Sequence, residues 1–180
     1  MRSRAVIYDR FADLLRYPAG DFTDTVERCR VLLSETYPEA AGQIGEFAET
    51  VRLLSPEQRQ ELFVQTFDLN PVCVLEVGWH LYGDTYDRGT FLVTMRQHMR
   101  RLELPEDSEL PDHLTHCLEV LGRMDVVGAD TFATKSILPA LEKMLAGMKG
   151  KASPYEYVLK GLEDVLTVDR TRVLEEVKHE

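Results

Sequence analysis

The sequence Leu69-Asn-Pro-Val-Cys-Val-Leu-Glu-Val-Gly-Trp79-His-Leu-Tyr82-Gly-Asp-Thr-Tyr-Asp-Arg88-Gly89 decides how the chain is divided into helices. Its apolar run, residues 72–81, is interpreted as a buried helix. A strand shows the same pattern over so short a length, but no second strand is predicted nearby to pair with it. The following four residues predict a turn, in which Gly83 supplies backbone freedom. A long helix is expected to begin at residue 85 or 87 and to end near 102.

The chain downstream of this stretch is predicted to contain a linker and a second helical half. Residues 104–112 hold two prolines and four acidic residues without helical periodicity, so they are interpreted as a linker or hinge that joins two helical halves. Apolar residues at helical spacing resume at Leu114, and a later helix is expected to be kinked or split at Pro139. A capping-box pattern at Ser153 opens the last helix, whose charged residues after about 166 are expected to fray.

Three amphipathic helices are predicted upstream, over residues 4–16, from about 22 to 37 and across 44–51, because apolar residues recur there at helical spacing. Ser55-Pro-Glu-Gln58 combines a capping box with a proline at the first helical position, which predicts a further helix start. The sequence contains no strand-like alternation of any length and no internal repeat. The predicted fold class is therefore all-α, a compact single-domain bundle of about eight to ten helices over residues 1–180.

Composition and charge exclude several functions. The chain has 180 residues, of which 44% are hydrophobic, and a net charge of −10. Such a balance disfavours binding to nucleic acid or to anionic membranes and favours cationic partners. Three cysteines without a CxxC pattern indicate reduced thiols and a cytoplasmic location. The first ten residues lack the apolar region of a secretory signal, and no apolar run approaches the roughly 20 residues of a membrane span.

Several short motifs together resemble the NarJ/TorD family, and within it the nitrate reductase delta branch. They are Phe63-Val-Gln-Thr-Phe-Asp68, Tyr82-Gly-Asp-Thr85 with Asp87-Arg-Gly89, Leu110-Pro-Asp-His-Leu114, and Ser153-Pro-Tyr-Glu-Tyr-Val-Leu159. Their order and spacing, rather than any single motif, carry the resemblance, which extends over most of the chain. Members of this family are cytoplasmic, all-helical chaperones that help to assemble molybdenum-cofactor oxidoreductases. The resemblance implies a protein that is not an enzyme and carries no cofactor or metal of its own.

The resemblance also implies a partner, namely the N-terminal segment of the apo catalytic subunit of a respiratory molybdoenzyme such as nitrate reductase. The chaperone would hold this subunit until the molybdenum cofactor is inserted, before the complex docks on the membrane. Residues 72–78 are more aliphatic than this family predicts, so chlorate, selenate or hydrocarbon-oxidising systems remain alternative clients. The residues expected to bind the client peptide are Trp79, His80, Leu81, Tyr82, Asp84, Arg88, Pro111, Asp112 and His113.

Local structure offers a second interpretation of the same residues. Asp112 could cap the helix that follows the linker, and Arg88 could form a salt bridge at the edge of the core. Trp79 could belong to the core rather than to a contact surface. Gly89 is costly inside a helix, so it is expected to allow the close approach of another backbone, from a neighbouring helix or a bound peptide.

Two other classes of function remain as alternatives. The first is a metal- or nucleotide-dependent helical enzyme. No GxSxG, GxGxxG or HExxH motif is present, and only His113 and His116, with nearby acids, could begin a metal site. Residues 147–153 resemble a phosphate loop, but Ala152 occupies the hydroxyl position. The second alternative is a helical scaffold that dimerises, and exchange of the two halves across residues 104–112 could produce a homodimer.

Overall fold

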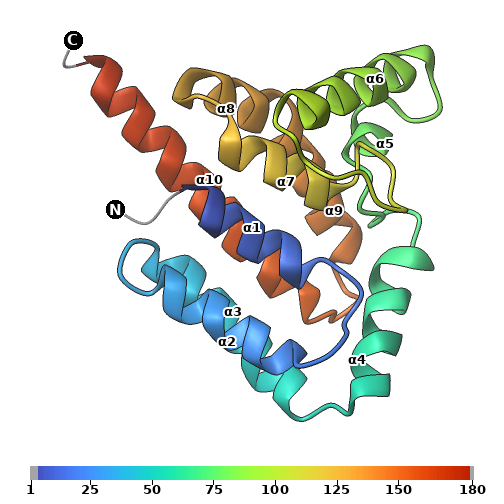
Figure 1. The fold of residues 1–180 in the computed structure, drawn as a ribbon. Coiled ribbons are helices and arrows are strands. Elements are labelled where there is room, and N and C mark those ends of the chain that lie inside the picture. The colour runs from blue at the N-terminus through green and yellow to red at the C-terminus, as the bar shows by residue number, and fades with distance from the viewer. Residues whose placement is uncertain (1–3, 179–180) are drawn as a thin grey trace.

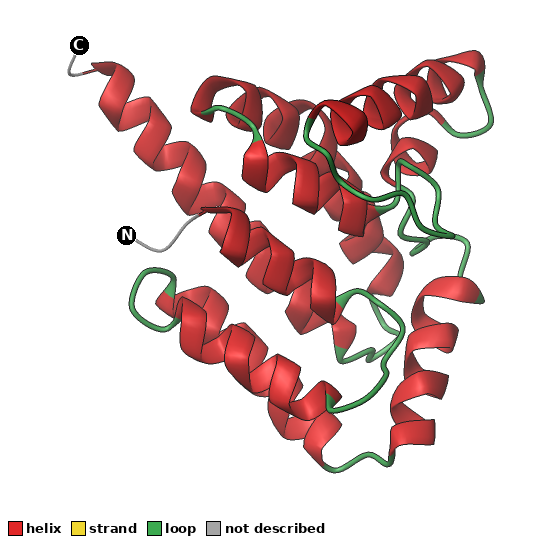
Figure 2. Ribbon diagram, in the orientation of Figure 1, coloured by secondary structure: helices red, strands yellow, loops and turns green. Residues whose placement is uncertain are grey.

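Helices account for nearly all regular structure in the computed structural model, which describes residues 4–178 (Figures 1 and 2). The α-helices are α1 (Arg4–Leu14), α2 (Phe22–Leu33), α3 (Pro38–Arg52), α4 (Pro56–Phe63), α5 (Val77–Tyr82), α6 (Tyr86–Arg101), α7 (Leu114–Arg123), α8 (Val126–Phe132), α9 (Leu138–Met148) and α10 (Tyr155–Lys178). Two π-helical segments, η1 (Val64–Asp68) and η2 (Ala133–Ile137), extend α4 and α8. The predicted all-α class is confirmed.

Helices from both ends of the sequence build the core together. Helix α1 packs against α7 and α2, and α10 packs against α3, α9 and α8 (Figure 1). Helix α5 contacts α6 and α9, so it joins the outlying α6 to the rest of the bundle. Helix α4 stands to one side of the bundle, and the chain that follows it leads to α5 (Figure 1). The α4–α5 connection and the end of the α6–α7 linker meet there, where Glu76 pairs with His113.

The predicted helix over residues 72–81 is correct only in its second half. Residues 69–76 form turns and extended backbone, and an isolated antiparallel bridge pairs Glu76 with His113. The Val77 N–H donates to the Asp112 carbonyl at 2.8 Å, and the Leu114 N–H donates to the Leu75 carbonyl at 2.8 Å. The end of the linker supplies a bridge partner that the sequence did not reveal, and this bridge fixes the linker against the start of α5.

The signals for helix starts and interruptions were mostly correct. Ser55 and Gln58 form the predicted capping box at the start of α4. The π-helical segment η2 ends immediately before Leu138 and Pro139. Because proline lacks the N–H that an α-helix needs there, the wider π turn lets the chain remain helical from α8 into α9.

The expectation that α10 frays after about residue 166 is wrong, because the helix continues to Lys178. Asp169 accepts hydrogen bonds from the hydroxyl groups of Tyr8, at 2.8 Å, and Tyr37, at 2.6 Å. The Arg172 guanidinium lies 5.1 Å from the centre of the Tyr37 ring. These contacts tie α10 to α1 and to the start of α3. Within residues 4–178, no helix has both the length and the apolar character that a membrane span requires.

Candidate functional site

An exposed aromatic surface lies where α5 meets α6. Gly83 ends α5 with φ of +60°, a conformation that favours glycine, and its N–H donates to the Trp79 carbonyl. Trp79 and Tyr82 are 39% and 37% exposed, and the Arg88 guanidinium lies 5.6 Å from the centre of the Trp79 ring. The structure thus brings together three of the residues that the sequence predicted for client binding, two of them with accessible rings.

Asp112 is a buried partner of Arg88 rather than a helix cap. Its side chain is 0% exposed, and its Oδ2 accepts from Arg88 Nε at 3.0 Å. Its other oxygen, Oδ1, has no hydrogen-bond partner among the described residues. The cap of α7 is His113, whose Nδ1 accepts from the Thr115 N–H. The capping prediction was therefore wrong by one residue, because the β-bridge turns the Asp112 side chain inward towards α6.

Where α5 meets α6, Gly78 rather than Gly89 permits a close approach. A Cβ atom at Gly78 would lie 2.6 Å from Asp112 Oδ2 and 2.9 Å from the Phe91 ring, whereas a Cβ at Gly89 would meet nothing within 4 Å. No neighbouring helix approaches Gly89, since this part of α6 faces open space, and the approach of a bound peptide there stays a prediction. A glycine within an aliphatic run was the available signal for position 78, and it lets α5 sit directly on the Arg88–Asp112 pair.

The other predicted residues divide into buried supports and exposed groups. His80 is buried, with Nε2 2.7 Å from the Val74 carbonyl, and its own carbonyl accepts from Lys143. Leu81 is half-buried against the core, and Pro111 is buried. Asp84 is exposed in the turn before α6. Only part of the predicted set can therefore touch a partner directly, and the remainder positions the exposed part.

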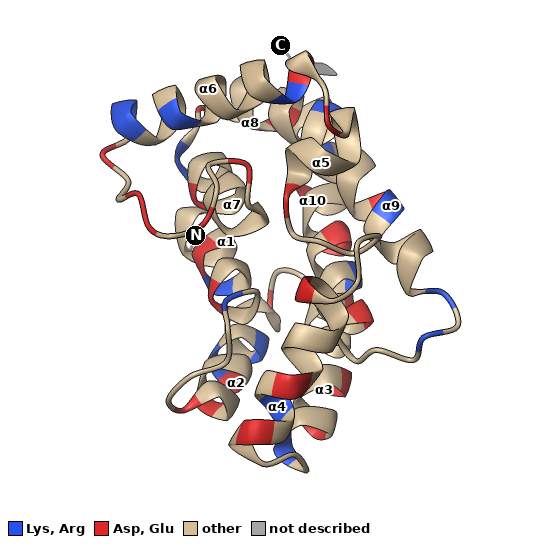
Figure 3. Ribbon diagram, turned by 90° about the vertical axis from the view of Figure 1, so that its right-hand side faces the viewer, with Lys and Arg blue, Asp and Glu red and all other residues tan. Residues whose placement is uncertain are grey.

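A groove of about 670 Å³ opens beside this surface, between the end of α1, the α4–η1 helix and the linker. Figure 3 views the molecule from this side and shows acidic segments on both the linker and α4. His113 is the only predicted site residue that lines the groove within the described part of the chain. The remaining lining residues are Leu15, Arg16, Tyr17, Phe63, Phe67, Asp68, Val74, Leu75, Glu76, Asp107, Ser108, Glu109 and Thr115.

Most of these lining residues were missed as site residues, although the sequence held partial signals for them. Phe63 and Phe67 belong to a motif that carried the family resemblance, but their role there was not predicted. Phe67 and Asp68 lie in the π-helical segment η1, and such segments are frequent at functional sites. Arg16 and Tyr17 are distant in sequence from the other lining residues, so no local pattern could have placed them in the groove.

An ion-pair network fixes the linker at one wall of the groove. Arg16 contacts Glu119 at 2.6 Å and Asp107 at 3.9 Å, and His116 Nε2 lies 3.0 Å from Asp107. His116, whose Nδ1 lies 3.5 Å from Glu119, and the hydrogen bond from Arg16 together outweigh burial and lower the pKa of Glu119 to about 2. The linker is thus joined to α1 and to α7 through charged groups.

The other acids of the groove lack such compensation. Burial raises the pKa of Asp68, and burial is also the main cause of the raised pKa of Glu76. Neither carboxylate forms an ion pair with a described residue. Glu109 lies 4.0 Å from His113 Nε2, but burial, with a smaller contribution from His116, lowers the pKa of His113 to about 4. His113 is therefore neutral at pH 7, and Glu109 gains no cation from it.

The geometry gives little support to the metal and nucleotide alternatives. The rings of His113 and His116 are 6.4 Å apart, and His116 is engaged with Asp107. No group of three potential metal ligands from His, Cys, Asp and Glu was found in the described part of the chain. In the phosphate-loop-like segment, Lys151 donates to Asn70 at 2.8 Å, and the Ser153 hydroxyl pairs with that of Thr66.

Replacing His113 with asparagine should make the protein less sensitive to mild acid. A histidine with an ordinary pKa of about 6.5 in the unfolded chain and about 4 in the fold binds fewer protons when folded. Folding stability should therefore fall as the pH drops from about 6.5 towards 4. Asparagine keeps a capping side chain at this position but does not titrate.

Urea unfolding at pH 7 and pH 5 would measure this effect. Between these two pH values, we expect the original protein to lose up to about 2 kcal/mol more stability than the His113→Asn variant. The pKa of His116 is raised, so its contribution has the opposite sign and is present in both proteins. Equal losses in the two proteins would contradict the prediction.

Comparison with known proteins gives one family match and several relatives. The model of the nitrate reductase delta subunit family matches residues 32–156, more than half of the chain. The nitrate reductase molybdenum cofactor assembly chaperone NarJ of Escherichia coli (strain K12) is 27% identical over 145 residues, which are 79% of this chain and 61% of that protein. The chain thus spans less than two thirds of the length of this relative.

Two further relatives extend the comparison. The probable nitrate reductase molybdenum cofactor assembly chaperone NarJ of Bacillus subtilis (strain 168) is 26% identical over 155 residues, covering 85% of this chain and 80% of that protein. The nitrate reductase-like protein NarX of Mycobacterium tuberculosis (strain ATCC 25618 / H37Rv) is 29% identical over 121 residues, covering 67% of this chain but only 18% of that protein.

Proposed function

The chain belongs to the nitrate reductase delta subunit family, and from that premise we propose that it is an assembly chaperone for the catalytic subunit of a nitrate reductase-like molybdoenzyme. It binds the N-terminal segment of the apo subunit, supports insertion of the molybdenum cofactor and acts before the complex docks on the membrane. It works in the cytoplasm, where the apo subunit is made. No residue of this chain is assigned a catalytic role.

The observation that carries this proposal is the exposed aromatic surface on α5 and α6. A tryptophan and a tyrosine with accessible rings, held on short rigid elements, are typical anchors of a peptide-binding surface. Trp79 lies on α5 against the Arg88 guanidinium, and Arg88 is in turn ion-paired with the buried Asp112. This support keeps the rings in place before the partner arrives, which reduces the entropy lost on binding.

The proposed mode of recognition is a helix laid along a surface. An amphipathic client helix places its apolar side chains on Trp79, Leu81 and Tyr82, and its cations meet acids at the edge of the same surface. Asp84 is exposed and can serve directly. Asp112 is buried, so it acts through Arg88 and not by contact. The net charge of −10 accelerates the encounter with a cationic segment.

Calorimetric titration with synthetic peptides tests this function. Each peptide would contain about the first thirty residues of one molybdoenzyme catalytic subunit from the same genome. We expect saturable binding to one peptide. The affinity should be about tenfold or more weaker for Trp79→Ala, because this variant loses an aromatic anchor that the client would bury. Higher salt should also weaken binding, since exposed charges are screened.

The control is Leu53→Ala. Leu53 follows α3 and is 75% exposed, and it belongs neither to the surface where α5 meets α6 nor to the groove. Its replacement should change the affinity less than about twofold, as is usual for residues outside the centre of an interface. Failure of every peptide to bind, or equal losses for the two variants, would contradict the proposal.

A homodimer formed by exchange of helical halves stays a prediction. Exchange across the linker would require the ion pairs of Asp107 with Arg16 and His116 to break and re-form between two chains. The Glu76–His113 bridge would have to do the same. Light scattering with and without peptide would measure the state directly.

A further inference from the structure

The groove beside the aromatic surface carries negative charge that the protein itself does not neutralise. Asp107 is engaged with Arg16 and His116, but Asp68, Glu76 and Glu109 have no charged partner at pH 7 among the described residues. Arg16 is the only lysine or arginine among the residues that line the groove. Two of the three unpaired carboxylates have their pKa raised by burial, so they are partly removed from water without a compensating cation.

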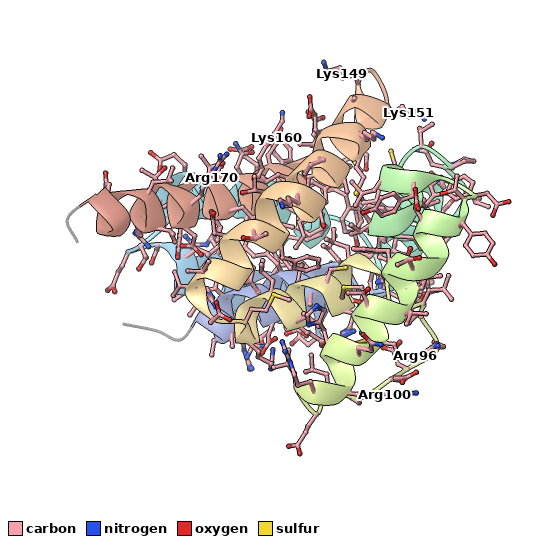
Figure 4. All side chains as sticks on the ribbon, turned by 90° about the horizontal axis from the view of Figure 1, so that it is seen from above. Arg96, Arg100, Lys149, Lys151, Lys160 and Arg170 are labelled. Carbon is pink, nitrogen blue, oxygen red and sulfur yellow. The ribbon has the colours of Figure 1, made fainter. Side chains whose placement is uncertain are left out.

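The protein's other cations point elsewhere. Figure 4 labels six of them, on α6, in the loop between α9 and α10 and on α10, and they project outward from these elements. Arg96 and Arg100 on α6 pair with Glu106 at 3.2 and 3.6 Å. None of the six lines the groove. Arg88 acts on Glu76 only at a distance and is ion-paired with Asp112. Since no lysine or arginine among the described residues forms an ion pair with Asp68 or Glu76, a cation that does so would come from a partner.

Apolar side chains form the other part of the groove. Phe63 and Phe67 lie with their ring centres 5.2 Å apart, and the Tyr17 ring meets Phe63 edge-on at 5.9 Å. Tyr17 is half exposed at the rim, whereas Phe67 is almost fully buried. A ligand with only charge would leave the exposed Tyr17 ring in water, and one with only apolar groups would leave the carboxylates unpaired. The groove suits a chain segment that carries both kinds of side chain.

We infer that this groove is a specificity site for a lysine or arginine of the client's N-terminal segment, which Asp68 and Glu76 bind while a neighbouring apolar side chain of the client packs on Tyr17 at the rim. The inference rests on the proposed function, because the occupant is part of the same segment that the aromatic surface binds. It adds residues that the aromatic surface does not contain, and it assigns the client's cation to a defined place.

Glu76 connects the two parts of the proposed binding surface. It lines the groove, and it lies directly before α5, whose Trp79 belongs to the aromatic surface. Arg88 and Asp112 both influence its titration, so it also lies near the pair that supports Trp79. One amphipathic segment can therefore contact the aromatic surface and the groove without a break between them.

The test is a comparison of two double variants with the same change in charge. Asp68→Asn/Glu76→Gln removes the two groove carboxylates. Glu35→Gln/Glu46→Gln removes two exposed carboxylates of the α2–α3 region that do not line the groove. Each variant changes the net charge from −10 to −8. The probes are the peptide that binds the original protein and the same peptide with its lysines and arginines replaced by glutamine.

We expect the groove variant to bind the original peptide about tenfold more weakly and the control variant less than about twofold more weakly. Charge pairs that are partly buried contribute strongly to affinity, whereas fully exposed pairs contribute little. The glutamine peptide should bind the original protein and the groove variant with similar, weaker affinity. Equal losses in the two double variants, or an unchanged affinity of the glutamine peptide, would overturn the inference while leaving the chaperone function intact. If no peptide binds the original protein, both the function and the inference fail.

Discussion

Replacing Arg88 with leucine is expected to lower the free energy of unfolding by about 3–5 kcal/mol, because removal of one partner leaves a buried charge unpaired. Asp112 is 0% exposed and receives its hydrogen bond from Arg88 Nε at 3.0 Å. Its second oxygen already lacks a partner among the described residues, so no other contact can take over. Urea unfolding followed by far-ultraviolet circular dichroism would measure the change.

The double variant Arg88→Leu/Asp112→Asn provides the control. Asparagine has nearly the shape of aspartate but no charge, so the cost of the buried carboxylate disappears when both partners are changed. We expect the double variant to recover at least half of the loss, which is the non-additivity of residues in direct contact. A cost of less than about 1 kcal/mol for Arg88→Leu alone, as for an exposed ion pair, would contradict this account of the pair.

Replacing Phe67 with alanine should cost a similar amount, about 3–5 kcal/mol, because the site loses a large buried ring and retains a cavity. Phe67 lies in η1, with its ring centre 4.9 Å from that of Tyr155 and 5.2 Å from that of Phe63. These rings join α10 to the α4–η1 helix beneath the groove. The variant should therefore also weaken peptide binding, measured by calorimetry under conditions in which it remains folded.

Tyr17→Ala is the matched control for Phe67. Tyr17 is 53% exposed at the rim of the same groove and contacts Phe63 only edge-on. Its loss should change stability by less than about 1 kcal/mol, since a ring half in water leaves no buried cavity, while still reducing peptide affinity. Equal stability losses for the two variants would show that Phe67 is not part of the core that η1 shares with α10.

Local signals in the sequence were sufficient for most of the helices. The capping box at Ser55, the glycine turn at Gly83 and the proline at position 139 each act over a few residues, and each was interpreted correctly. The failure at residues 72–76 had a different cause. Their backbone is held by hydrogen bonds to the linker, and a pairing between segments more than thirty residues apart leaves no periodic trace in either of them.

The site was less predictable than the fold for the same reason. Trp79 and Tyr82 could be recognised by type, but whether a ring is exposed depends on neighbours distant in sequence. For Asp112 the sequence suggested a helix cap or a client contact. The structure shows a third role, as the buried partner of Arg88, because one β-bridge turns its side chain towards α6. The groove combines residues that follow α1 with residues of the α4–η1 helix, the α4–α5 connection, the linker and the start of α7. Only the folded arrangement of these segments creates it.

The hydrogen bonds of Asp169 have a consequence for the order of events during synthesis. This carboxylate in α10 is joined to Tyr8 and Tyr37, which precede it by 161 and 132 residues. The Tyr8 hydroxyl of α1 and the side of α3 that packs on α10 thus lack these partners until α10 has left the ribosome. Contacts of such long sequence separation slow folding. A protein that is proposed to bind an incompletely folded subunit therefore passes through an incompletely folded state of its own, in which α1 and α3 lack their contacts with α10.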